Sequence, residues 1–317
     1  MNTRLKTGII GAGRIAQGFD SPGDRRVLTL AHAVAKSKRL IPGGFFDSRP
    51  ARAQAAEKKW NCPAGPRDRE VWLDAGWDVF FIATPDGEHA RDLADILKRR
   101  PKAVLVEKPL ALDGRIALRL LKRAKQTGIP VLVDFPRRQH SGCRRIGEML
   151  VSGELGVLLQ ARGIYSGGLK HNGVHLLDVL FSWCGPVGNV RLMAKRSGMF
   201  WLEMQTRRGP VALTLCEARQ TGCYIWELCC DTNKARVELA GAPEILKLYR
   251  GRGHSHYPEF TVLQEKRSWP VDGEPLLART VEHLARLAGD PAATRAHLDL
   301  EIERQRFFNK VFQLCKP

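Results

Sequence analysis

The chain has 317 residues, enough for two domains with a hydrophobic core in each. Hydrophobic residues make up 44% of it and charged residues 26%, which is typical of globular proteins, and no apolar run approaches the ~20 residues of a membrane span. The formal net charge of +18 favours small anionic ligands over nucleic acid, because the basic residues are dispersed and only 7% of residues are aromatic.

Eight cysteines are scattered along the chain without a C-x-x-C pair. This pattern predicts neither a metal centre nor a redox dithiol, and it favours a reducing cytoplasmic environment. Residues 1–6 lead directly into the first predicted strand, so we expect no secretory leader before it.

A glycine-rich turn follows the first strand, which is predicted at residues 8–10. The two glycines allow a positive φ and a close approach of a diphosphate to main-chain N–H groups. A helix that opens at Arg14 would add partial positive charge at the same place, and a small residue at 16 allows close helix–strand contact. The expected contacts with a dinucleotide in this turn are Gly11, Gly13, Arg14, Ile15 and Ala16.

Apolar runs and helix-spaced segments then alternate up to residue 134. Turn-rich residues 19–24 predict a loop that interrupts the first helix. Strands that are apolar throughout, alternating with helices, predict an α/β fold of the Rossmann class with a doubly wound parallel sheet. Further strands are predicted at 40–46, 78–83, 103–106 and 129–133, and helices at 27–35, 51–59, 88–99 and 112–126.

The pattern changes after residue 134, where extended segments with short connections favour antiparallel pairing. We therefore expect two domains: a dinucleotide-binding domain over 1–134, and an α+β domain with an open, mainly antiparallel sheet over 135–317. In the second domain, helices are predicted at 143–151, 172–183, 276–288 and 294–314, and strands at 157–165, 190–195, 199–206, 211–219, 223–231, 236–239 and 245–250.

Polar residues follow the second strand, and ligands of doubly wound sheets bind beyond such strand ends. Asp47 could accept hydrogen bonds from the adenosine ribose of NAD, although it lies 36 residues after Gly11 and not the usual ~20, a difference that we assign to the inserted loop. Ser48 and Arg49 would instead suit the 2′-phosphate of NADP. NAD is therefore expected and NADP stays open, as does a role for Asp47 as a helix N-cap.

Two further strand ends carry polar groups, Thr84-Pro85 and Glu107-Lys108-Pro109. A lysine is normally a solvated surface residue. Lys108, however, follows a buried strand at the rim of the expected cleft, where its amine could exchange a proton with a substrate hydroxyl.

A second polar group is predicted on one face of the helix at 172–183 and the residues before it. His171, His175, Asp178 and Ser182 recur at helical spacing, while most other positions are apolar, so this stripe is expected to line a cleft. Two alternatives stay open. The histidines could be satisfied core residues, or they could bind zinc, although Asn172 stands where H-E-x-x-H has its glutamate.

Together these motifs resemble the glucose–fructose oxidoreductase / inositol dehydrogenase / MocA (Gfo/Idh/MocA) family over essentially the whole chain. The resemblance implies NAD(P)-dependent hydride transfer at a sugar or polyol carbon, and an open sheet whose exposed face forms a homodimer or homotetramer. It also implies that Lys108 holds the reacting hydroxyl and that His175 is a general acid/base. The residues that would help to seat the cofactor are Thr84, Pro85, His89 and Glu107.

One position departs from the family pattern. Many family dehydrogenases carry an aspartate four residues before the acid/base histidine, and here His171 occupies it. An imidazole cannot stabilise a protonated His175 as a carboxylate does. We nevertheless include His171 among the catalytic candidates, and we expect Lys108 and His175 to face one crevice.

The sequence thus predicts a dehydrogenase or reductase acting on CH–OH groups of a carbohydrate-like, anionic substrate, with a nucleotide-linked sugar as one candidate. Two alternatives stay open: an NAD-dependent glycoside hydrolase of the same family, and a non-catalytic dinucleotide-binding regulator. The predicted substrate contacts are Arg138, Tyr165, Lys170 and Asn172.

Overall fold

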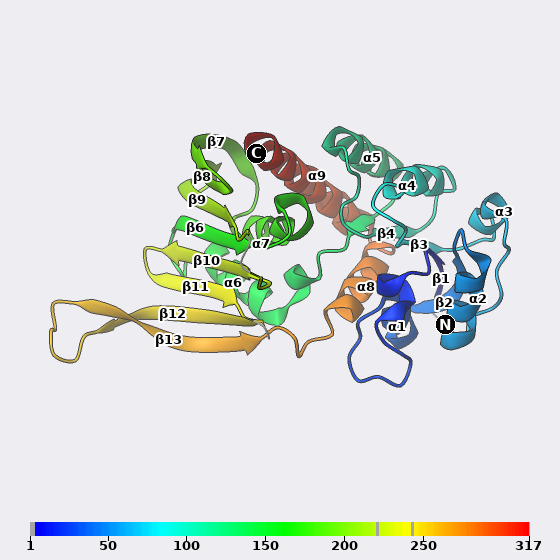
Figure 1. Cartoon of the computed structure of the whole chain (residues 1–317), viewed down its shortest axis with the longest axis horizontal. Helices are drawn as coiled ribbons and strands as arrows, with labels where there is room; N and C mark the ends of the chain where they lie inside the picture. The colour runs from blue at the N-terminus through cyan, green and yellow to red at the C-terminus, as the bar shows by residue number, and fades with distance from the viewer. Residues whose placement is uncertain (1–3, 220–221, 242–243, 317) are drawn as a thin grey trace. The chain divides into compact units, whose positions relative to one another are not determined.

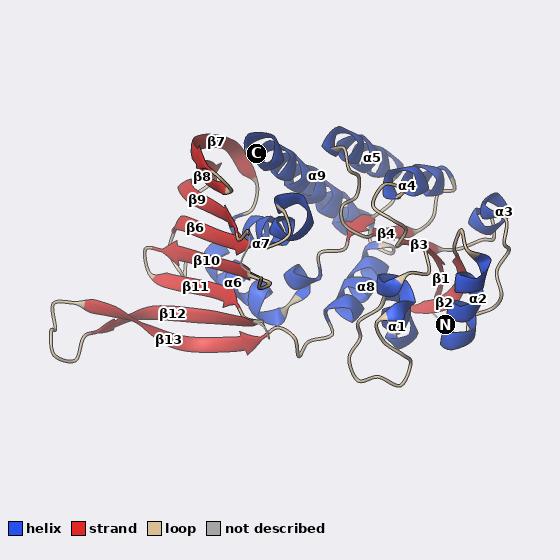
Figure 2. Ribbon diagram, viewed as in Figure 1, coloured by secondary structure: helices blue, strands red, loops and turns tan. Residues whose placement is uncertain are grey.

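The structure is a computed structural model that describes residues 4–219, 222–241 and 244–316. The first three residues of the predicted lead-in therefore lie outside the described residues. The chain divides into two compact units (Figures 1 and 2). The Rossmann unit runs to Pro136 and includes Pro275–Gln305, and the second unit comprises Arg137–Glu274 and the residues from Arg306 onward.

This division differs from the single boundary expected after residue 134. The first crossing lies close to that position, but α8 (Leu276–Leu287) and most of α9 (Pro291–Leu314) belong to the Rossmann unit. The reason is packing, because Val281 and Leu284 of α8 are fully buried in the same core as Ile9 and Phe81 of the sheet.

The sheet of the Rossmann unit has five parallel strands in the order β2-β1-β3-β4-β5. Each strand is largely buried because helices cover both of its faces, as the apolar runs predicted. The chain reverses its direction of winding between β1 and β3, and ligands of such sheets bind at that point. The strands are β1 (Leu5–Ile10), β2 (Leu40–Phe46), β3 (Val79–Ile82), β4 (Ala103–Val106) and β5 (Val131–Val133).

The predicted interruption of the first helix is confirmed. A π-helical turn at Arg14–Gly18 follows the glycines, and the α-helix begins only at Leu30, with Thr29 as its N-cap. The short helix α3 was not predicted. The remaining helices of this unit are α1 (Leu30–Lys36), α2 (Pro50–Trp60), α3 (Arg69–Leu73), α4 (His89–Lys98) and α5 (Gly114–Thr127).

The second unit contains an eight-stranded sheet in the order β13-β12-β11-β10-β6-β9-β8-β7, with α6 and α7 on one face (Figures 1 and 2). The predicted open, mainly antiparallel sheet is confirmed. One pairing differs, because β6 and β9 run parallel. The elements are α6 (Ser141–Val151), β6 (Leu158–Tyr165), α7 (Val174–Cys184), β7 (Val187–Arg196), β8 (Met199–Thr206), β9 (Gly209–Glu217), β10 (Trp226–Thr232), β11 (Ala235–Ala240), β12 (Ile245–Gly253) and β13 (Thr261–Pro270).

Strand β13 was missed by the sequence analysis. Most of its residues are exposed, so it lacks the alternation of apolar and polar residues that marks a half-buried strand. It pairs with β12 in a hairpin whose distal part extends beyond the other strands (Figure 1). Among the described residues, no helix combines the length and apolar character that crossing a membrane requires.

Candidate functional site

The glycine turn lies at the carboxyl end of β1, where the sequence analysis predicted it. Gly11 has φ +92°, and a Cβ there would lie 2.7 Å from the nitrogen of Thr84 and closer still to the carbonyl of Ala83. Gly13 differs, because a Cβ there would meet nothing within 4 Å. Gly11 therefore allows β1 and the residues after β3 to approach each other, whereas Gly13 leaves open backbone that a ligand can reach.

The residues after the glycines close the turn against the sheet. Ala16 is fully buried, and Ile15 packs against the same core. Arg14 is exposed, with its guanidinium 4.8 Å from the centre of the Phe19 ring. The small residue at 16 thus has the packing role expected of it, and Arg14 is the cation of the turn that solvent can reach.

Asp47 joins the end of β2 to this turn. One of its carboxylate oxygens accepts the backbone N–H of Ala12 at 2.9 Å, and the other accepts the N–H of Arg49 at 2.9 Å. Asp47 is half-buried, while Ser48 and Arg49 are exposed. The inserted loop therefore accounts for the long spacing in sequence, since Asp47 and the glycines are adjacent in space.

That inserted loop is organised by one buried carboxylate, Asp20. It accepts hydrogen bonds from the hydroxyl of Thr29 and from the N–H groups of Leu28 and Thr29, and it contacts Nδ1 of His32 at 2.8 Å. Burial alone would raise the pKa of Asp20, but these hydrogen bonds outweigh it and hold the pKa below its usual value. The loop is consequently anchored to the start of α1.

His89 connects the other two predicted strand ends. The side chain is 1% exposed, with Nε2 2.7 Å from the carbonyl oxygen of Thr84 and Nδ1 2.7 Å from that of Pro109. The Thr84 hydroxyl in turn donates to buried Asp92 at 2.9 Å. Pro85 is exposed. His89 thus connects the loop that carries Thr84 to the loop that carries Lys108.

Glu107 directly follows β4, and Asp134 directly follows the neighbouring strand β5. Val106 and Val133 are register partners, so the residues after them lie side by side at the same edge of the sheet. Burial raises the pKa of Glu107 well above its usual value, the charge and hydrogen bonding of Asp134 add to this, and the charge of Lys108 opposes it. The two carboxyl groups therefore form a pair next to half-buried Lys108.

Asp134 was missed by the sequence analysis, although the signal was present. It directly follows a buried strand, as do Asp47 and Glu107, and polar residues at such strand ends are candidates for a site. What the sequence did not indicate is the register of β4 against β5, which makes Asp134 the neighbour of Glu107.

The edge formed by these strand ends fits a dinucleotide. The open backbone at Gly13 suits a diphosphate, because N–H groups can reach it without a side chain in between. Asp47 has carboxylate oxygens beside that turn that can accept hydrogen bonds from ribose hydroxyls. Exposed Ser48 and Arg49 stand next to Asp47, where they could contact the 2′-phosphate of NADP. The site is therefore suited to NAD through Asp47 and to NADP through these two residues.

The second group of predicted residues lies at the start of α7 in the other unit. Residues Leu169–Gly173 form a π-helical turn, and α7 continues directly from it. His175 is half-buried and His171 is exposed. Among the described residues, no group of three or more His, Cys, Asp or Glu side chains is placed to bind a metal ion.

Asp178 of α7 lies close to Arg138, and both side chains are largely buried in this unit. The Asp178 side chain is 1% exposed, and one of its carboxylate oxygens lies 3.8 Å from a guanidinium nitrogen of Arg138. The Ser182 hydroxyl donates to the backbone carbonyl of Asp178 at 2.8 Å. Along the predicted stripe, His171 and Ser182 are therefore exposed, whereas Asp178 between them is buried.

The other predicted substrate contacts have structural partners of their own. Tyr165 is 1% exposed and would be within 3.1 Å of a Cβ at Gly173, so its ring supports the turn before α7. The Asn172 amide donates to the carbonyl of Ser166 at 2.8 Å. The ammonium of Lys170 lies 5.9 Å from the centre of the Phe312 ring. Contact of any of these side chains with substrate stays a prediction.

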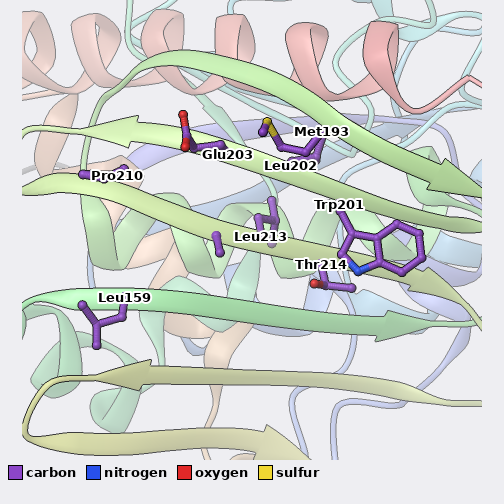
Figure 3. A pocket seen from close by; sticks show the side chains of 9 residues that line it. Leu159, Met193, Trp201, Leu202, Glu203, Pro210, Leu213 and Thr214 are labelled. Carbon is purple, nitrogen blue, oxygen red and sulfur yellow. The ribbon is translucent and has the colours of Figure 1, made fainter.

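The outer face of the eight-stranded sheet carries a shallow hollow of about 380 Å³ over β6–β9 (Figure 3). Its lining is mostly apolar and includes Leu159, Met193 and Trp201. None of the predicted site residues lines it. Assembly of copies through this face stays a prediction.

Comparison with known proteins identifies the Rossmann unit. Residues 5–135 match the family model described as "Oxidoreductase family, NAD-binding Rossmann fold", GFO_IDH_MocA. Inositol 2-dehydrogenase of Mycolicibacterium gilvum is 31% identical over 157 residues, which are 48% of this chain and 40% of that protein. Trans-1,2-dihydrobenzene-1,2-diol dehydrogenase of mouse is 26% identical over 168 residues, 53% of this chain and 47% of that protein. The matched stretches therefore span less than half of these relatives.

Solved structures share the fold of both units. A candidate NADPH-dependent oxidoreductase from Desulfitobacterium hafniense aligns with a TM-score of 0.77 at 18% identity, over 98% of this chain and 94% of that one. The 3-ketoreductase KijD10 from Actinomadura kijaniata, in complex with TDP-benzene and NADP, aligns with a TM-score of 0.71 at 17% identity, over 97% and 96%.

An oxidoreductase from Agrobacterium radiobacter, in complex with NAD+, L-tartaric acid and magnesium, aligns with a TM-score of 0.69 at 14% identity, over 97% of this chain and 95% of that one. At these identities the likeness shows the fold alone. The match to the family model is confined to residues 5–135, where the glycine turn, Asp47 and the strand ends lie. Residues 5–135, which are less than half of this chain, therefore match the NAD-binding Rossmann fold of the GFO_IDH_MocA oxidoreductase family.

Proposed function

We propose that this chain is an NAD(P)-dependent oxidoreductase that transfers a hydride between nicotinamide and a hydroxyl or keto carbon of a carbohydrate-like substrate. The observation that carries the proposal is the arrangement at one sheet edge of the Rossmann unit. There the open backbone of Gly13, the carboxylate of Asp47 and the amine of Lys108 follow strands of the same parallel sheet.

Different residues of this edge bind different parts of the cofactor. The glycine turn binds the diphosphate through main-chain N–H groups, and Asp47 binds the adenosine ribose. Thr84 and Pro85 lie on the next loop, which His89 ties to the loop of Lys108. When bound, the nicotinamide accepts or donates the hydride.

Lys108 and His175 handle the oxygen of the substrate in this proposal. Oxidation of an alcohol releases the hydroxyl proton as the hydride leaves, so a base must take that proton, and reduction requires an acid to return it. Lys108 hydrogen-bonds the reacting oxygen, and His175 exchanges the proton with it. His171, which is exposed at the turn before α7, remains a catalytic candidate beside His175.

The substrate proposed is an anionic or nucleotide-linked sugar. The net charge of +18 attracts anions to the protein. Relatives of the Rossmann unit include inositol 2-dehydrogenases, and a neighbour in fold was solved with TDP-benzene and NADP, so polyols and nucleotide sugars are the first classes to test. A cytoplasmic location and a homo-oligomer remain predictions.

The test begins with the cofactor. Denaturing the purified protein and identifying released nucleotide by mass, followed by titration with NADH and NADPH, would determine whether a dinucleotide binds. A panel of polyols, sugars and nucleotide sugars is then assayed by nicotinamide absorbance with the wild type and with Lys108→Ala. We expect turnover with at least one compound and its loss by about 10²-fold or more in the variant.

Two other results would contradict the proposal. Cleavage of a glycoside without net change in nicotinamide absorbance would make the chain a hydrolase. Tight dinucleotide binding with no turnover of any compound, unaffected by Lys108→Ala, would make it a regulator.

A further inference from the structure

The cofactor-seating role predicted for Glu107 does not explain why a second carboxyl group, that of Asp134, lies beside it at the ends of β4 and β5. Parallel strands lie about 4.8 Å apart, and side chains at registered positions point to the same face. Glu107 and Asp134 follow the registered pair Val106 and Val133, and their backbone N–H groups bond to Ile82 at 2.9 Å and to Val106 at 2.8 Å. The two backbones are therefore held side by side at this sheet edge, with both side chains on the same face.

Burial makes two charges at this place costly. Asp134 is 3% exposed, and Oε1 of Glu107 is inaccessible to solvent. Two carboxylates that share a buried position repel each other, and the usual result is that one of them retains its proton. That proton can bridge the two groups, and hydrogen bonding with Asp134 is among the causes that raise the pKa of Glu107.

The pair is connected to Lys108 in two ways. The Glu107 carboxyl interacts with the charge of Lys108, and it accepts a hydrogen bond from the backbone N–H of Lys108. Asp134 and Lys108 are the titratable groups that act on Glu107 from the ends of β5 and β4, respectively. A change at Asp134 is thus transmitted through Glu107 to the backbone and the charge of Lys108.

We propose that Asp134 is a positioning residue for Lys108: it shares one proton with Glu107, so that the pair presents a single negative charge to the Lys108 ammonium and holds its backbone. The proposal deepens the proposed function, since it rests on that function for the catalytic role of Lys108. When the shared proton is lost at alkaline pH, Lys108 faces two negative charges and its ammonium form is favoured.

The shared proton can be observed directly by infrared spectroscopy of the full chain during a pH titration. We expect the wild type to show, at neutral pH, the C=O stretch of a protonated carboxylic acid, which disappears as the pH rises. Glu107→Gln should lack this band at neutral pH, and in Asp134→Asn it should disappear at a lower pH. Asp113→Asn, at an exposed helix N-cap, is the matched control and should behave as the wild type.

The effect on Lys108 is measured by its rate of acetylation, read by peptide mass spectrometry relative to exposed Lys98 of the same sample. In Asp134→Asn the pair cannot carry two charges, so we expect Lys108 to react about two- to tenfold faster than in the wild type at alkaline pH, with little difference at neutral pH. A loss of structure at Asp134 would change the rate equally at both pH values.

The inference is overturned if the wild type lacks the protonated-carboxyl band at neutral pH, if both variants retain it unchanged, or if the acetylation difference does not depend on pH. Neither measurement needs a substrate. Unchanged turnover in Lys108→Ala would end the catalytic role of Lys108 in the proposed function and would leave both of these measurements intact, so the two failures are distinguishable.

Discussion

The carboxylate of Asp47 accepts a hydrogen bond from the backbone N–H of Ala12 at 2.9 Å, across 35 positions of the chain. This contact joins the end of β2 to the glycine turn after β1. A group suited to a ribose and a backbone suited to a diphosphate are therefore held next to each other, although a loop of unusual length separates them in sequence.

The first prediction concerns this contact. Asp47→Ala removes the acceptor for two backbone N–H groups and for the ribose, and hydrogen bonds to a charged group contribute about 1.5–3 kcal/mol each. We expect the dissociation constant for the preferred dinucleotide to rise at least about tenfold, as measured by calorimetry. Asp113→Ala, which removes an exposed helix cap, should leave that constant unchanged. Equal affinities in both variants would contradict the assignment of Asp47.

The two glycines of the turn predict opposite outcomes. Gly11→Ala places a methyl group against the backbone at Ala83 and Thr84 and strains a positive φ, so we expect a loss of about 2–4 kcal/mol in the free energy of unfolding. Gly13 has φ −78°, which any residue adopts, so Gly13→Ala should change that free energy by less than about 0.5 kcal/mol. It should instead weaken dinucleotide binding, because the methyl group stands where the diphosphate approaches. Urea unfolding and a binding titration separate the two effects.

Asp20 predicts a pH dependence of stability. Its pKa is lowered in the folded protein, so its contribution to stability is complete above the ordinary pKa of aspartate and is lost as the pH falls through the folded value. We expect Asp20→Asn to be less stable than the wild type by about 1–3 kcal/mol near neutral pH, and this difference to shrink on acidification. Asp24→Asn, on the exposed part of the same loop, is the control. A difference that does not vary with pH would show that the charge of Asp20 has no part in it.

His175 and His171 are expected to differ in their effect on turnover. If His175 is the general acid/base, His175→Ala should lower kcat about 10²–10⁴-fold and alter the pH profile. His171 is exposed at the π-helical turn, so His171→Ala should keep kcat within about threefold of the wild type. The two variants are assayed with the substrate found in the panel. A larger loss from His171→Ala than from His175→Ala would reverse the two assignments.

Local patterns predicted the Rossmann unit well. Buried strands such as Val79–Ile82 and Ala103–Val106 are apolar at every position, and this pattern needs no knowledge of distant residues. The glycine turn and the interrupted first helix follow from the conformational preferences of single residues. The candidate cofactor residues at strand ends were found in the same way, because each directly follows an apolar strand in the sequence.

Other features depend on contacts between distant segments and could not be predicted in this way. Helix α8 joins the Rossmann unit because its apolar face completes that core, and a helical pattern does not say which core its apolar face will join. Strands β6 and β9 pair in parallel across intervening elements, which short connections do not indicate.

By itself, the sequence determined which segments are buried strands, where the backbone must turn, and which polar groups stand at strand ends, because these depend on residues adjacent in the chain. Only the tertiary structure decided that Asp134 would lie beside Glu107 and that Asp47 would reach Ala12. Both contacts depend on strand register and on packing across the sheet, which are set by the burial of many side chains at once and not by any local motif.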